Sequence, residues 1–194
     1  MKSLNLKCAF VFALGLALVS LLGYELPAWA AFAPVAFGVT ANVAGLSLVD
    51  EFKTAVQFAL TGTTAETVLA SVNIPGGLLG ANGEIDVEYQ ASVTNGANDK
   101  TLTLKLGGTT VISQLVTAVT GVHGRALISL RNAANSQHFQ KYTASDGAAL
   151  TAAATAVGAV NMQNDTLLTI SGTLEVGGEL ITLEKFRARF YKAA

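Results

Sequence analysis

The sequence predicts an all-β fold: an antiparallel, jelly-roll-like β-sandwich preceded by a hydrophobic N-terminal segment. From about residue 50 onward, apolar and polar residues alternate in short runs bounded by Gly, Asn, Asp and Ser, as in half-buried strands. About nine such runs follow one another with no regular alternation of helices between them. Nineteen glycines among 194 residues suit the tight turns that such strands need. A sandwich or barrel is therefore favoured over a parallel α/β fold.

Residues 1–30 have the order of a secretory signal peptide. Lys2 and Lys7 precede an uncharged apolar run from Cys8 to Gly23, and small residues at Ala28 and Ala30 predict cleavage before Ala31. Two alternatives stay open. The run is slightly shorter than the roughly 20 residues of a membrane span, so an uncleaved anchor is possible, as is an arm retained in an assembly. Residues 31–49 are expected to be an apolar linker or arm, and residues 50–194 the sandwich domain.

The first strands are expected at residues 53–61 and 66–74. They are separated by the short segment GTTA, which predicts a hairpin. The turn-like segment GGLLGANG, residues 76–83, lacks the Lys-Ser/Thr ending of a phosphate-binding loop and is expected to be only a turn.

A second hairpin is predicted from residues 84–93 and 100–108, joined by the polar loop TNGAND. Alternation gives each strand a core face. On the first strand this face holds Ile85, Val87, Tyr89, Ala91 and Val93, and on the second it holds Leu102, Leu104 and Leu106. Glu84, Asp86 and Glu88 then point away from the core. Lys105 is expected on the same outward face, where it would form an ordinary cross-strand ion pair.

Five further strands are expected in the second half of the chain, at residues 109–119, 124–132, 136–144, 165–176 and 179–192. The Ala-rich segment 147–160 is the one stretch whose composition also suits a helix.

The acidic row Glu84, Asp86 and Glu88 is not expected to be catalytic. Carboxylate pairs that catalyse hydrolysis face each other across a cleft, whereas alternate residues of one strand lie side by side on an open face. A calcium site is a weaker alternative, because no Asp-rich loop completes a cage. His123, expected in a turn, and His138, expected in a strand, lack the cysteine or acidic cluster of a zinc site. We therefore expect no enzyme activity, cofactor or metal.

The charge balance predicts local contacts with partners. Twelve basic and thirteen acidic residues give a net charge of −1, so no overall field attracts nucleic acid or an anionic membrane. Any membrane contact would be made by the N-terminal segment, if it is uncleaved.

The C-terminal strand places Phe186, Ala188 and Phe190 on one face and Lys185, Arg187 and Arg189 on the other. Two interpretations stay open. The strand is a solvated edge, whose cations discourage unwanted pairing. Alternatively, the cations form an assembly interface with acidic residues of another copy, for which Glu84, Asp86 and Glu88 are the candidates.

Two stretches carry a family resemblance. Residues 70–111, ASVNIPGGLLGANGEIDVEYQASVTNGANDKTLTLKLGGTTV, and residues 124–142, GRALISLRNAANSQHFQKY, resemble segments of bacteriophage virion jelly-roll domains. The resemblance extends over roughly residues 50–191. It implies a non-enzymatic capsid decoration, head-fibre or tail-associated protein, located in the virion, whose partners are copies of itself or a capsid or tail protein. The alternative is an exported β-sandwich that binds a surface ligand such as a carbohydrate. An exposed aromatic platform would favour that alternative, and Tyr142 and Tyr191 are its candidates.

Overall fold

The computed structural model describes residues 46–54 and 57–193. The predictions for the signal-like segment 1–30, its cleavage before Ala31 and most of the linker 31–49 fall outside these residues. Within the described part of the chain, no helix has the length and apolar character needed to cross a membrane.

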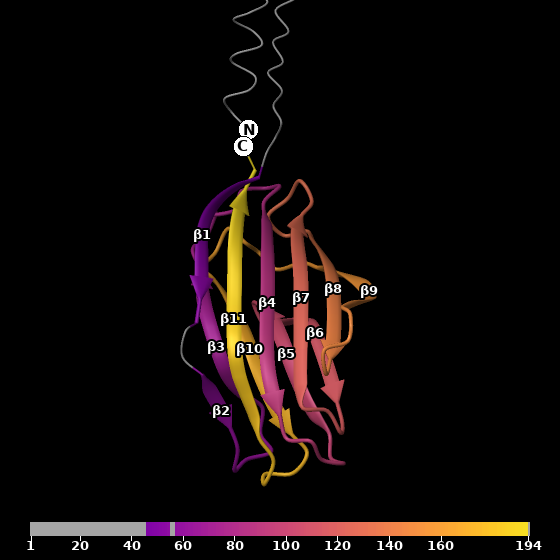
Figure 1. Cartoon of the computed structure of the whole chain (residues 1–194). Helices are drawn as coiled ribbons and strands as arrows, with labels where there is room; N and C mark the ends of the chain where they lie inside the picture. Colours follow the sequence, from indigo (N-terminus) through magenta and orange to yellow (C-terminus); the bar gives the residue numbers. More distant parts are fainter. Residues whose placement is uncertain (1–45, 55–56, 194) are drawn as a thin grey trace, which may run out of the picture. The chain divides into compact units, whose positions relative to one another are not determined.

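Eleven strands make up the described fold, which forms two antiparallel sheets (Figure 1). The large sheet has the order β1-β11-β4-β7-β8-β9, with β2 also paired to β11, and the small sheet has the order β3-β10-β5-β6. The strands are β1 Ser47–Lys53, β2 Phe58–Leu60, β3 Thr67–Ile74, β4 Glu84–Val93, β5 Lys100–Leu106, β6 Thr109–Val116, β7 Gly121–Leu130, β8 Gln137–Ser145, β9 Thr151–Gly158, β10 Thr166–Leu174 and β11 Ile181–Lys192. The all-β, jelly-roll-like sandwich expected from the sequence is confirmed.

The core lies between the two sheets and contains the apolar rows that alternation predicted. The inward residues of β4, β5 and β11 are almost completely buried: Ile85, Val87, Tyr89, Leu102, Leu104, Leu106, Phe186, Ala188 and Phe190. Tyr89 has its phenol inside this core and donates a hydrogen bond to Gln114 Oε1 at 2.8 Å. Burial raises the pKa of Tyr89, so the phenol stays neutral. A Cβ on the facing Gly124 would lie 2.2 Å from the tyrosine ring, so only glycine fits there.

Both hairpin predictions are wrong. β4 pairs with β11 and β7 in the large sheet, whereas β5 pairs with β6 and β10 in the small sheet. Likewise, β2 pairs with β11 in the large sheet, and β3 pairs with β10 in the small sheet. Alternation identifies the buried face of a strand but not its neighbour, and two strands whose buried faces meet across the core give the same pattern as a hairpin. The loop TNGAND therefore connects the two sheets.

Several local predictions are also corrected. The segment expected as one strand at 53–61 contributes only the end of β1 and the short β2, and β1 begins at Ser47, ahead of the expected domain boundary at residue 50. The Ala-rich segment is strand β9, because β8 offers it a free edge. His123 lies in β7 and not in a turn. β11 lies between β1 and β4, so the solvated-edge interpretation of its cations is wrong.

Four of the five edge strands, β1, β3, β6 and β9, share one irregularity, whereas the three-residue β2 pairs with β11 in regular register. Each of these four carries an extra residue relative to its single neighbour, so that its register shifts once. Such β-bulges twist an edge strand and disturb its free row of backbone donors and acceptors. These four edges are therefore poor templates for pairing with another chain.

Candidate assembly surface

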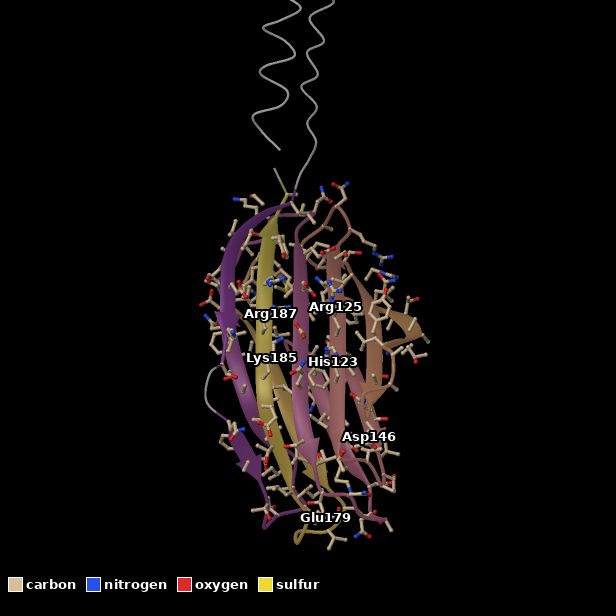
Figure 2. The ribbon with its side chains drawn as sticks, in the orientation of Figure 1. His123, Arg125, Asp146, Glu179, Lys185 and Arg187 are labelled. Carbon is tan, nitrogen blue, oxygen red and sulfur yellow. The ribbon has the colours of Figure 1, made fainter. Side chains whose placement is uncertain are left out.

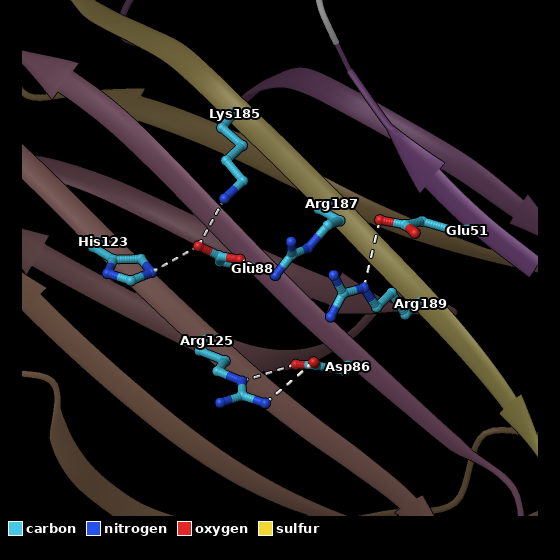
Figure 3. Close-up of polar contacts among 8 residues, drawn as sticks. All are labelled: Glu51, Asp86, Glu88, His123, Arg125, Lys185, Arg187 and Arg189. Atoms are coloured by element: carbon cyan, nitrogen blue, oxygen red, sulfur yellow. Dashed lines mark hydrogen bonds and ion pairs between the residues drawn. The ribbon is translucent and has the colours of Figure 1, made fainter. Parts of the chain in front are cut away.

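The outer face of the large sheet carries a group of charged side chains that we call the charged face (Figures 2 and 3). They come from four neighbouring strands, β1, β11, β4 and β7. On β11, β4 and β7 they point outward because residues beside them in sequence fill the core. The charged face consists of Glu51, Asp86, Glu88, His123, Arg125, Lys185, Arg187 and Arg189.

Glu88 is the centre of the charged face (Figure 3). One carboxylate oxygen accepts a hydrogen bond from Lys185 Nζ at 2.9 Å, and the same oxygen lies 3.5 Å from His123 Nε2. The other oxygen accepts a hydrogen bond from Arg187. Burial alone would raise the pKa of Glu88, but the hydrogen bond from Lys185 and the charges of Lys185, Arg187 and His123 together outweigh burial and lower it. Glu88 is therefore held ionised beneath three basic groups.

A second pair is formed by Asp86 and Arg125. The guanidinium donates two hydrogen bonds to the two carboxylate oxygens, from Nε at 2.9 Å and from Nη2 at 3.2 Å. This two-point contact fixes the plane of the arginine. The hydrogen bond to Asp86 raises the pKa of Arg125 further. On the other side of β11, Arg189 Nε lies 3.4 Å from Glu51.

Asp86 and Glu88 lie deeper than the bases that contact them. The side chains of Asp86 and Glu88 are 9% and 15% exposed, whereas those of Arg187, Lys185 and Arg125 are 24%, 26% and 44% exposed. These two carboxylates thus serve as counter-ions beneath a cationic layer formed by Arg187, Lys185 and Arg125. Around this layer lie the exposed acids Glu184 on β11 and Glu51, which is 38% exposed.

The structure brings most of the six predicted interface residues together. Lys185 and Arg187 meet Glu88 within one chain, while Arg189 and Asp86 find the partners Glu51 and Arg125. Glu84 accepts a hydrogen bond from Ser129 at 3.1 Å. The role of these six residues between copies stays a prediction. Lys105 does not join them: it lies on the small sheet and pairs with Glu66.

Sequence reasoning missed three members of the charged face: Glu51, His123 and Arg125. The alternation in β7 already contains the signal, because Ala126 and Ile128 are inward and Arg125 must then point out. What the sequence does not contain is the adjacency of β7 to β4.

The polar side chains of this surface do not have the arrangement of a hydrolytic catalytic triad. Glu84, Ser129 and His138 are cross-strand neighbours on β4, β7 and β8. However, the Ser129 hydroxyl donates a hydrogen bond to Glu84, so the serine lies between the other two residues. A serine triad requires the histidine base in that middle position. Among the described residues, no group of three or more His, Cys, Asp or Glu side chains could hold a metal ion. Tyr142 and Tyr191 are both half-buried, so neither forms an exposed aromatic platform.

No family model and no curated protein matches the sequence. Solved structures show similarity at the level of the β-sandwich. The CBM2 module of the evolved Dit of Lactobacillus casei BL23 phage J-1 is 12% identical, with 64% of this chain and 69% of that chain covered and a TM-score of 0.35. A seed lectin of Lotus tetragonolobus is 10% identical, with 75% and 93% covered and a TM-score of 0.42. The VP2 subviral particle of infectious bursal disease virus is 12% identical, with 75% and 41% covered and a TM-score of 0.30. These likenesses concern the fold alone, and none of them identifies a ligand or partner.

Proposed function

We propose that the chain is a non-enzymatic structural protein of a bacteriophage virion, a decoration, head-fibre or tail-associated protein that acts through protein–protein assembly. The observation that carries the proposal is the cationic layer of the charged face. Arginine is enriched at interfaces. Cations already held by Glu88 and Asp86 lose less conformational freedom when a partner binds, so less of the binding energy is spent on ordering them. The resemblance of residues 70–111 and 124–142 to virion jelly-roll domains supports the same role.

The partner surface is expected to be acidic, either on a second copy or on a capsid or tail protein. Attraction between such surfaces weakens as salt screens the charges. Sedimentation of the purified chain, alone and with particles lacking it, would measure association at low and high salt. We expect the double variant Arg187→Glu with Arg189→Glu to lose association and its salt dependence.

Two further variants separate charge from folding. Arg187→Lys with Arg189→Lys keeps both charges and should retain part of the association, although lysine cannot form the two-point contact. Lys105→Glu changes a lysine on the opposite sheet and should leave association unchanged. If the double glutamate variant melts like the wild type and associates equally well, the charged face is not the interface.

The location in the virion is tested separately. Particles banded on a density gradient and analysed by mass spectrometry should contain peptides from the described part of the chain in stoichiometric amounts. Peptides found only in the unassembled fraction would reject a structural role in the virion.

The sequence of residues 1–30 favours a second candidate function, an exported β-sandwich that binds a surface ligand such as a carbohydrate. A basic end, an apolar run and small residues before Ala31 together direct a protein to the secretion machinery. Expression in a bacterial host separates the candidates. An exported chain beginning at Ala31, absent from particles, supports the second function, whereas a full-length chain in banded particles supports the first.

A further inference from the structure

The outer face of the large sheet contains a hollow of about 290 Å³ at the ends of β4, β7 and β8 that meet the turn after β8. It lies beside the charged face and shares His123 with it. Figure 2 labels His123 and Asp146, two of the residues that line it. The hollow exists because small residues occupy outward positions here. Ala144 is the cross-strand neighbour of His123, and Gly121 has no side chain. Sites for drug-sized ligands have volumes of about 300–1,000 Å³, so this hollow suits a single small ring.

Asp146 lies at the rim of the hollow, where hydrogen bonds hold it in place. Its Oδ1 accepts three hydrogen bonds, from the backbone N–H of Thr120 at 2.7 Å, from Thr120 Oγ1 at 2.9 Å and from the backbone N–H of Gly121 at 2.9 Å. These bonds, first among them the one from the Thr120 backbone, lower the pKa of Asp146. Asp146 has a φ of +48°, a left-handed conformation that costs energy in a residue other than glycine. The hydrogen bonds maintain this conformation and hold an ionised carboxylate at the rim.

The groups around the hollow differ in their hydrogen-bonding character. Gln90 offers both an amide donor and an acceptor, and Asp146 offers acceptors only. His123 also lines the hollow, but its Nε2 is buried beside Glu88 and is not offered to a ligand. Ala144 and Ala148 add apolar side chains to this lining, whereas Ala91 and Val122 belong to the core and are only 4% exposed. An anion is disfavoured by Asp146, and a large apolar ligand does not suit a polar rim. A neutral ring with hydroxyls at its edge and C–H groups on its face matches both parts of the lining.

We propose that this hollow binds one sugar residue, with Asp146 and Gln90 hydrogen-bonded to ring hydroxyls and Ala144 and Ala148 beneath the C–H face. The proposal does not depend on the assembly function, because it uses the turn after β8 and not the cations above Glu88. A single ring in an open site forms few contacts, so the expected Kd is on the order of 1 mM or weaker.

The test is an NMR titration of the ¹⁵N-labelled full chain with the methyl glycosides of glucose, galactose, mannose and N-acetylglucosamine. At least one of these probes should shift the amide signals of Gly121, His123 and Asp146 in a saturable way. Ala144→Leu fills the hollow without entering the core and should abolish the response. Gln90→Ala, which removes an exposed side chain, should weaken binding several-fold.

Gln140→Ala is the matched control, because Gln140 lies on the same face of β8 outside the hollow and its loss should leave binding unchanged. The proposal is overturned if none of the four glycosides shifts these signals. It is equally overturned if Ala144→Leu, with an otherwise unchanged spectrum, responds like the wild type. Glycoside binding without particle association, or the reverse, would separate this site from the proposed function.

Discussion

Replacing Glu88 by Gln should destabilise the fold and alter its response to acid. The variant keeps the shape of the side chain but removes the charge that Lys185 and Arg187 share. Hydrogen bonds to charged groups contribute about 1.5–3 kcal/mol each. The two cations are 26% and 24% exposed and regain hydration when released, so the expected loss is reduced to about 1–2 kcal/mol in all. Urea unfolding at pH 7, followed by circular dichroism, would measure it.

The pH dependence follows from the lowered pKa of Glu88. In the unfolded chain a glutamate titrates near pH 4.3. A carboxyl with a lower pKa in the folded state adds stability above pH 4.3 and loses it as the pH falls through the folded pKa. Gln does not titrate, so the stability difference between wild type and Glu88→Gln should be largest at neutral pH. It should shrink as the pH falls below about 4.3.

Glu84→Gln is the control for this prediction. Glu84 accepts a hydrogen bond from Ser129 and has no cation within salt-bridge distance among the described residues, so its replacement should cost under about 1 kcal/mol. If Glu88→Gln is no less stable than Glu84→Gln, or if its deficit is the same at acidic and neutral pH, Glu88 is not the electrostatic centre of this face.

Three further predictions concern the interior. Gly124→Ala places a Cβ 2.2 Å from the Tyr89 ring and should cost about 1–3 kcal/mol in urea unfolding, whereas Gly178→Ala, with no atom within 4 Å, should cost far less. Val87→Asp puts a charge at a fully buried position and should cost about 3 kcal/mol or more, measured as a fall in Tm relative to Glu84→Ser. Lys100→Met leaves the buried carboxylate of Glu179 without its partner at 3.1 Å and should cost about 3–5 kcal/mol, and adding Glu179→Leu should restore most of that stability.

The sequence predicted the faces of strands well and their neighbours poorly. Every second residue of β4 and β5 is buried as alternation requires, because a pleated strand turns successive side chains to opposite sides. In β11 a bulge between Leu183 and Lys185 interrupts the alternation, which resumes at Phe186. The position of each strand within the two sheets, in contrast, depends on which distant strands it pairs with. β4 lies beside β11 and β7, which are distant in sequence, and no local pattern contains that information. Hairpin expectations failed because a loop that connects two sheets has the same turn residues as a hairpin loop.

The same limit explains what was predictable about the charged face. The acids of β4 and the bases of β11 could be placed on outward faces by parity alone. The contact between these acids and bases within one chain could not be predicted, because it depends on the antiparallel pairing that puts Arg187 opposite Glu88. A pairing between copies and a pairing within the chain have the same sequence pattern. Arg125 completes the surface only because β7 is the other neighbour of β4.

The β-bulges in the edge strands limit which surfaces of the sandwich are available for assembly. Under the proposed virion role, many copies of the chain lie at high local concentration, where open sheet edges would pair with one another. Here β1, β3, β6 and β9 each carry an extra residue that interrupts the regular backbone pattern. Gln114, on the outer strand β6, also donates a hydrogen bond to the backbone of Ala144 on β8 at 2.9 Å, which ties the edge of the small sheet to the large one. Association that avoids the edges must use a face or an end of the sandwich. The charged face offers ordered cations. These cations would select an acidic partner surface, because a positively charged surface is repelled.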